Sequence, residues 1–166
     1  MVRRPSKRVC MGAVAPLFLG GCGYLMWFGL HPPSWTDVGT HCERATREDS
    51  AAAAVAWNVV IPEGVTDVYR CTDGPGGGPA GTAHFAFQVP RGRVSAYFAR
   101  MGVESLPGYD VRAQFSDFSV KAGHDVATVN SYEAGSMTKG FFSHTLLADE
   151  DAGDVATVYV ETVSSG

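Results

Sequence analysis

Ser136 and Lys139 form the sequence pattern S-x-x-K, which is typical of some nucleophilic enzymes. In acyl-enzymes with this pattern the lysine lies beside the serine and activates its hydroxyl group. The S-D-N and K-T-G elements that accompany the pattern there are missing here, and Gly135 and Gly140 flank the segment, which indicates a turn. The chain has twelve serines and three lysines, so a chance match to this short pattern is not unusual. A small envelope hydrolase or acyl-enzyme using Ser136 and Lys139 is therefore kept only as an alternative.

The histidines and acidic residues do not predict a metal centre. No pair of histidines has the H-x-x-x-H or H-E-x-x-H spacing among His31, His41, His84, His124 and His144. His124 and Asp125 could form half of a catalytic triad, but no G-x-S-x-G sequence supplies a nucleophile. Asp149, Asp151 and Asp154 miss the spacing of a calcium loop and indicate a solvated hairpin turn. We therefore assign no catalytic, cofactor-binding or metal-binding residue and expect no cofactor.

Two of the four cysteines, Cys42 and Cys71, are predicted to form a disulfide bond. The other two, Cys10 and Cys22, belong to an apolar stretch near the N-terminus. Disulfides persist in compartments outside the cytoplasm, where we expect this part of the chain to be. Metal binding by Cys42 and Cys71 is the weaker alternative, because neither has a C-x-x-C partner.

Residues 9–30 carry no charge and would span roughly 33 Å as a helix that rises about 1.5 Å per residue, enough to cross a bilayer once. Arg3, Arg4, Lys7 and Arg8 precede the stretch, and the first acidic residue is Asp37. This asymmetry predicts a cytoplasmic N-terminus and an extracytoplasmic remainder. We expect a basic tail at residues 1–8, an anchor or signal at 9–30, a linker at 31–39 and one domain at 40–166.

Cys22 offers a second interpretation of the same stretch. It ends the sequence Leu-Gly-Gly-Cys, which fits the lipobox of a bacterial lipoprotein signal and would make Cys22 the lipidated residue. A lipidated cysteine is usually followed by a polar tether, whereas residues 24–28 here are apolar. A signal anchor and a lipoprotein therefore both remain open, and each places the domain at the outer face of the cell membrane.

The charge of the chain is divided unevenly. Of the 13 Lys and Arg residues four precede residue 9, whereas all 17 Asp and Glu residues follow residue 30. The expected extracytoplasmic part is therefore acidic, which disfavours nucleic acid as its partner. The expected partners are the lipid bilayer, through the N-terminal anchor, and another protein or component of the envelope.

The pattern of the remaining chain predicts an α+β domain. Capping and helical periodicity indicate helices at 46–59 and 94–101, the second ending at Gly102. Alternating or β-branched residues indicate strands at 66–71, 82–89, 125–132, 140–148 and 154–163, and residues 110–120 are treated mostly as a loop. The pentapeptide at 125–129 recurs at 154–158 and suggests two similar strands. We expect one antiparallel sheet with about two helices packed on one face.

Residues 61–102 combine an Ile-Pro-Glu-Gly-Val-Thr-Asp-Val segment, a loop, an alternating strand ending in Val-Pro and an amphipathic helix. This combination resembles uncharacterised small membrane-anchored proteins and lipoproteins of high-GC Gram-positive bacteria. The resemblance implies a place in the envelope. The group has no established activity or catalytic residues to transfer.

These observations favour a membrane-tethered extracytoplasmic domain that binds another envelope component without catalysing a reaction. One alternative is the hydrolase described above, acting through Ser136 or a histidine. Another is a structural accessory subunit of a membrane complex, whose anchor would do the assembling.

Overall fold

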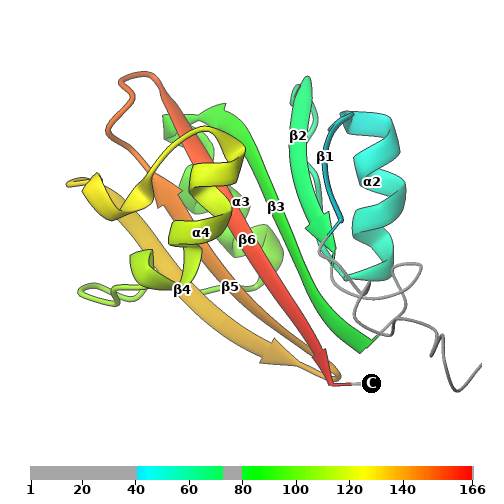
Figure 1. Cartoon of the computed structure of the whole chain (residues 1–166). Helices are drawn as coiled ribbons and strands as arrows, with labels where there is room; N and C mark the ends of the chain where they lie inside the picture. Colours follow the sequence, from blue (N-terminus) through cyan, green and yellow to red (C-terminus); the bar gives the residue numbers. More distant parts are fainter. Residues whose placement is uncertain (1–40, 73–79, 166) are drawn as a thin grey trace, which may run out of the picture. The chain divides into compact units, whose positions relative to one another are not determined.

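A computed structural model of the chain describes residues 41–72 and 80–165. The described residues form one six-stranded antiparallel sheet in the order β1-β2-β3-β6-β5-β4, with three α-helices (Figure 1). The strands are β1 (His41–Thr46), β2 (Asp67–Thr72), β3 (Ala80–Pro90), β4 (Tyr132–Lys139), β5 (Phe142–Asp149) and β6 (Val155–Ser165). The predicted α+β class with an antiparallel sheet is therefore confirmed.

The predicted tail, anchor and linker at residues 1–8, 9–30 and 31–39 lie outside the described residues, and so does Cys22. Within residues 41–72 and 80–165, no helix is both long and apolar enough to cross a membrane.

The strands β3 and β6 form the centre of the sheet, because both are long and rich in β-branched and aromatic residues. Phe85 lies opposite Val160 and Phe87 opposite Val158, and all four side chains are buried on one face. Since alternate residues of a strand point to opposite faces, Ala86 and Tyr159 lie on the other.

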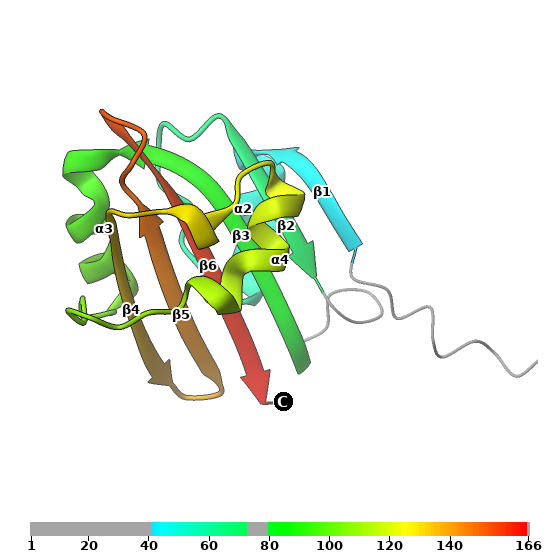
Figure 2. The same ribbon diagram turned by 60° about the vertical axis from the view of Figure 1, so that its left-hand side comes forward.

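Helices cover both faces of this sheet. Helices α2 (Arg47–Ala56) and α3 (Val94–Met101) pack on the face that carries Phe85 and Phe87. Helix α4 (Arg112–Ala122) packs on the opposite face through Phe115 and Phe118. In Figure 1, α4 lies in front of the sheet and α3 behind it, and in the turned view of Figure 2 α3 lies at the left while α4 stays in front of the strands. The sheet is therefore the middle layer of three, with a separate apolar core on each side.

The two predicted helices, α2 and α3, share one face as expected, but a third helix, α4, covers the other face and was not predicted. Helix α4 begins after Val111, whose side chain makes no capping hydrogen bond, and its sequence mixes polar residues with a few apolar ones. Its stability comes from burying Val111, Phe115 and Phe118, at positions i, i+4 and i+7, against the sheet. Tertiary packing makes a helix of a segment that was expected to be mostly loop.

The strand predicted at 125–132 is also wrong. Residues Val126–Thr128 form a single 3-10 turn, η4, which follows helix α4. Asp125 caps this turn, since its Oδ1 accepts a hydrogen bond from the Ala127 N–H group at 2.9 Å. The chain enters the sheet later, in β4, and the edge strand β1 was likewise not predicted.

Gly135 lies inside β4 rather than at a turn. A Cβ atom at this position would lie 2.2 Å from the Glu104 carbonyl oxygen and 2.7 Å from Val103 Cγ1. The segment after α3 therefore approaches β4 so closely that only glycine fits. Gly140, with φ +63°, occupies the predicted turn between β4 and β5.

The predicted disulfide is confirmed. Cys42 of β1 and Cys71 of β2 lie directly opposite each other in the ladder and are bonded. In the described residues β1 pairs with β2 alone, so the bond fastens an edge strand to the sheet. Arg70 of β2 adds an ion pair to Glu43 of β1, with the Nε and Oε1 atoms 2.8 Å apart.

Candidate functional site

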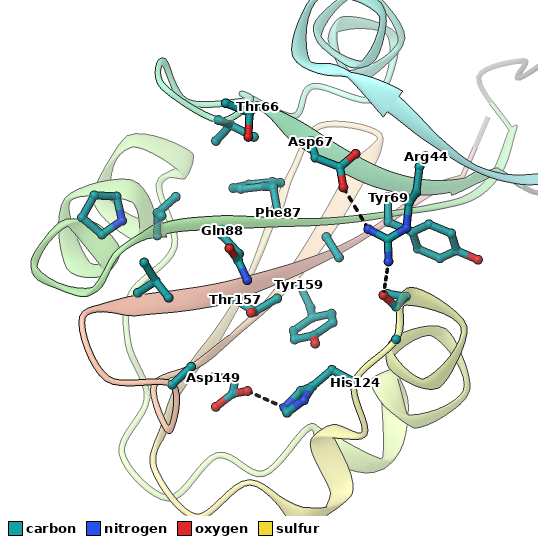
Figure 3. A pocket seen from close by; sticks show the side chains of 18 of the residues that line it. Arg44, Thr66, Asp67, Tyr69, Phe87, Gln88, His124, Asp149, Thr157 and Tyr159 are labelled. Carbon is teal, nitrogen blue, oxygen red and sulfur yellow. Dashed lines mark hydrogen bonds and ion pairs between the residues drawn. The ribbon is translucent and has the colours of Figure 1, made fainter.

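A hollow of about 640 Å³ lies beside the C-terminal end of α4. We call it the α4-side cavity. Residues of β1, β2, β3 and β6, together with the turn at Ala122–His124, line it (Figure 3). The volume falls within the range of small-molecule sites.

The strands β3 and β6 provide its floor. Ala86 lies opposite Tyr159 in the ladder and Gln88 opposite Thr157, so the four side chains share the face on which α4 packs. Ala86 and Tyr159 are buried, Thr157 is half-buried and the Gln88 amide is exposed. The floor is therefore apolar beneath α4, at Ala86 and Tyr159, and polar where it is exposed, at Gln88 and Thr157.

Tyr159 is the buried polar residue of this floor. Its side chain is fully buried and its ring packs against Phe115 and Phe118 of α4, with centroids 6.1 and 6.2 Å away. Its hydroxyl group makes no hydrogen bond to any described residue. Burial raises the pKa of Tyr159 above its usual value, and the negative charge of Asp149 raises it further. The hydroxyl therefore stays protonated and remains available as a donor.

Replacement of Tyr159 by phenylalanine should leave the free energy of unfolding unchanged or raise it by about 1 kcal/mol. A buried hydroxyl without a partner costs roughly 1–3 kcal/mol of desolvation, and phenylalanine removes this cost at nearly constant volume. Urea denaturation of both proteins measures the difference. A loss of stability above about 1 kcal/mol would mean that the hydroxyl has a partner in the folded protein.

His124 and Asp149 contact each other at one side of the cavity. Asp149 ends β5 with its side chain 2% exposed, and its Oδ2 atom lies 2.6 Å from His124 Nε2. Its Oδ1 atom accepts a hydrogen bond from the Asp151 N–H group. The His124 side chain is 49% exposed, and no described residue bonds its Nδ1 atom. A buried carboxylate thus orients an imidazole that still reaches solvent.

Gly123 positions this histidine. It follows the last residue of α4 with φ +102°, a left-handed conformation that glycine adopts readily. The His124 N–H group then donates to the Ser119 carbonyl oxygen at 2.9 Å, which closes the end of the helix. The C-terminal cap of α4 therefore fixes where the imidazole meets β5.

Arg44 of β1 forms the opposite wall. Its guanidinium donates to Asp67 Oδ2 at 2.9 Å and to the Ala122 carbonyl oxygen at 2.6 Å, and it lies over the Tyr69 ring (Figure 3). A cation is favourable at the C-terminal end of a helix. Arg44 therefore joins strands β1 and β2 to α4, and Asp67 compensates its charge.

The charged side chains of the cavity thus pair with one another, Arg44 with Asp67 and His124 with Asp149. The uncharged groups left for a ligand are the Gln88 amide and the Thr157 hydroxyl, and the Nδ1 atom of His124 is bonded to no described residue. The Tyr69 ring supplies an apolar surface. This arrangement suits a neutral polar molecule with one apolar face, and it does not concentrate charge.

The structure does not bring Ser136 and Lys139 together. Both are exposed on β4 and they are three residues apart, so their side chains point to opposite faces of the sheet. The S-x-x-K arrangement needs a helix, where positions i and i+3 share a face. The hydrolase alternative therefore finds no support in this pair.

The histidine and aspartates that the sequence offered as site residues also have partners other than the predicted ones. His124 pairs with Asp149, whereas the neighbouring Asp125 caps η4. The Asp151 carboxylate accepts hydrogen bonds from the N–H groups of Asn130 and Ser131, which lowers its pKa. These bonds fix the backbone just before β4. Among the residues described, no three His, Cys, Asp or Glu side chains gather as a metal site.

Sequence reasoning missed the pairing of His124 with Asp149 and the roles of Arg44 and Tyr159. One signal was available for Tyr159, because alternation in the predicted strand at 154–163 places it on the same face as Thr157. No local spacing relates residue 124 to 149 or residue 44 to 67.

His144 lies outside the cavity and gives a pH-dependent prediction. It is buried on β5, its Nδ1 atom lies 2.9 Å from Thr162 Oγ1, and its Nε2 atom bonds no described residue. Burial lowers the pKa of His144, and the charge of Lys139 lowers it further. The unfolded chain binds this proton near pH 6.5 and the folded protein only at lower pH, so stability should fall as pH drops below about 6.5.

Urea denaturation at about pH 7.5 and about pH 5.5 measures this loss in the parent and in His144→Gln. The glutamine does not titrate and can still bond Thr162. The variant should lose less stability between the two pH values than the parent does. An equal loss in both proteins would show that His144 does not bind the proton differently on folding.

Comparison of the chain with protein-family models, with curated proteins and with solved structures found no match, so the resemblance of residues 61–102 to small envelope proteins stays a prediction.

Proposed function

We propose that the chain is an extracytoplasmic binding domain that holds a small, neutral, polar ligand in the α4-side cavity. The observation that carries this proposal is the floor of the cavity, where a buried tyrosine without a hydrogen-bond partner adjoins the accessible Gln88 and Thr157. A concave site with an apolar surface and a few converging polar groups is the usual form of a ligand site.

The ligand class follows from the groups that line the cavity. Gln88 can donate and accept, Thr157 offers a hydroxyl, and the Tyr69 ring can pack against an apolar face. Because Arg44 and His124 already pair with carboxylates, a charged ligand would have to displace one of these partners. A sugar ring or a short uncharged peptide has the required combination of hydroxyl or amide groups and an apolar face.

The place of the domain in the cell is proposed from the sequence. The uncharged residues 9–30 behind a basic tail support attachment to the membrane, either by a signal anchor or by a lipid on Cys22. The Cys42–Cys71 disulfide is compatible with an oxidising compartment. The ligand would then be a molecule of the cell envelope or its surroundings.

Chemical-shift mapping tests the binding function. The purified full-length chain, labelled with ¹⁵N, is titrated to millimolar concentrations with N-acetylglucosamine and separately with an N-acetylated dipeptide amide. We expect one of these probes to shift the amide signals of Gln88, Thr157 and residues 122–124, with the signals of α2 and α3 unchanged. Absence of any shift with both probes, or shifts confined to other surfaces, would contradict the proposal.

A second candidate function, hydrolysis, is favoured by the His124–Asp149 pair alone. The carboxylate orients the imidazole as in a catalytic dyad, so His124 could take a proton from a water molecule while the oxygen attacks an ester carbonyl. Rates of 4-nitrophenyl acetate hydrolysis by the parent, His124→Gln and His41→Gln test this candidate. His41 is an exposed histidine of β1 and controls for non-specific imidazole reactivity. Equal rates in all three proteins would exclude this role for His124.

A further inference from the structure

A second hollow, of about 480 Å³, lies on the opposite face of the sheet, between α3 and residues 62–65. We call it the α3 hollow. Val65, Val89 and Pro90 give it an apolar wall, and Arg93, Tyr97 and Arg100 line it from the side of the helix. The two hollows adjoin, since Gly64, Val65 and residues 88–90 at the end of β3 line both.

Arg93 and Arg100 are the arginines without partners in the part of the chain that the structure describes. The remaining arginines there each bond a carboxylate or a carbonyl oxygen: Arg44, Arg47, Arg70, Arg91 and Arg112. Arg93 immediately precedes α3 and Arg100 lies near its end, about two helical turns further on, and both line the hollow. Ala96 lies between them and leaves space for a ligand.

Tyr97 adds an independent observation. Its side chain is 4% exposed and packs edge-on against Phe87, and its hydroxyl group bonds no described residue. Burial raises the pKa of Tyr97, and the positive charge of Arg100, which lines the same hollow, opposes this effect. A buried hydroxyl without an acceptor is costly, and an oxyanion held by Arg100 could supply that acceptor.

Glu63 is the one carboxylate that lines this hollow. It is exposed and makes no ion pair with a described residue, so its side chain can turn toward solvent. Its charge opposes that of a bound anion. It does not neutralise either arginine.

We propose that the α3 hollow binds an amphiphilic anion, a phosphate or carboxylate group carried on an apolar body. The two guanidinium groups and the Tyr97 hydroxyl would hold the oxyanion, and the wall of Val65, Val89 and Pro90 would receive the apolar part. Because the chain after residue 30 is acidic, the affinity must come from this local arrangement and not from the overall field of the domain. The site is distinct from the α4-side cavity and takes a ligand of different charge.

Octyl phosphate below its micelle concentration is the probe for this site, and calorimetry with the full-length chain measures its affinity. Inorganic phosphate tests the anion alone, and octyl glucoside tests the apolar body alone. Octyl phosphate should bind at least about tenfold more tightly than either. Equal binding of octyl glucoside would overturn the proposal, because the arginines would then contribute nothing.

Single-charge variants locate the site. Arg93→Gln and Arg100→Gln should each weaken octyl phosphate binding by about tenfold or more, as expected for the loss of a charge-assisted hydrogen bond. Lys121→Gln removes the same charge from an exposed position on α4, on the other face, and should change the affinity little. Equal losses of affinity in all three variants would mean that octyl phosphate binding depends only on the overall charge of the protein, and the proposal would be wrong.

Tyr97→Phe separates a ligand role from a structural one. The variant should keep or gain stability, since the hydroxyl has no partner among the described residues, yet should bind octyl phosphate less tightly than the parent. Unchanged affinity would remove Tyr97 from the site. Thr157→Phe, which alters only the α4-side cavity, should leave octyl phosphate binding intact, so failure at one site is distinguishable from failure at the other.

Discussion

Replacement of Cys42 and Cys71 together by alanine should lower the free energy of unfolding by about 3.6 kcal/mol. The bond joins residues 29 apart in sequence, and on the chain-entropy model a loop of this length restricts the unfolded chain by that amount. Total stabilities of single domains are only about 5–15 kcal/mol, so the loss would be a large fraction of the whole. Urea denaturation of the parent and the double variant measures it.

The parent treated with a reductant serves as the control and should match the double variant, because both lack the same bond. A loss below about 1 kcal/mol in both proteins would show that the disulfide restricts the unfolded chain little. The variant has a second expected effect, on binding. Since β1 carries Arg44, release of this edge strand would remove one wall of the α4-side cavity.

Phe85→Ala should destabilise the domain by about 3–5 kcal/mol, the range for a buried phenylalanine reduced to alanine. Phe85 is fully buried at the centre of β3, between β2 and β6, and belongs to the core beneath α2 and α3. Its removal leaves a cavity that the neighbouring strands cannot close without breaking their ladders. Thermal and urea unfolding measure the loss.

Phe141→Ala is the matched control, since Phe141 is 68% exposed in the turn between β4 and β5. The same chemical change there should alter stability by no more than about 0.5 kcal/mol. Similar losses in the two variants would contradict the two-core architecture, because the effect would then not depend on burial in the sheet.

Elements with strong local signals were predictable from the sequence. Helix α3 has apolar residues at positions i, i+3, i+4 and i+7 and ends at Gly102, with φ +75°. Strand β3 alternates cleanly, and Thr46 caps α2 by accepting the Asp49 N–H group. In these segments propensity, capping and burial all favour the same structure, which is why the sequence alone sufficed.

A repeated pentapeptide shows where local sequence is insufficient. The residues Asp-Val-Ala-Thr-Val occur at 125–129 and at 154–158, and both copies were predicted as strands. The second copy enters β6 and pairs with β3 and β5 on its two sides. The first follows the Gly123 cap and turns through η4, burying Val126 and Val129 near α4. Long-range pairing, absent from the local sequence, decides between the two outcomes.

The candidate site was less predictable than the fold for the same reason. Its ion pairs join residues 44 with 67 and 124 with 149, and only the sheet order and the cap of α4 bring these positions together. The one local motif, Ser136 and Lys139, does not form a catalytic pair, because its segment is a strand and places the two side chains on opposite faces. Spacing carries chemistry only when the secondary structure that it assumes is present.

Ligand binding in the α4-side cavity is tested most directly by filling that cavity. Thr157→Phe places a bulky side chain on its floor, whereas Val163→Phe makes a comparable change at a 41% exposed position on the same strand and the same face, outside the cavity. The probe that shifts the signals of Gln88 and residues 122–124 in the parent should bind Val163→Phe with unchanged affinity and Thr157→Phe at least about tenfold more weakly. Equal affinity for the two variants would show that the ligand does not occupy this cavity.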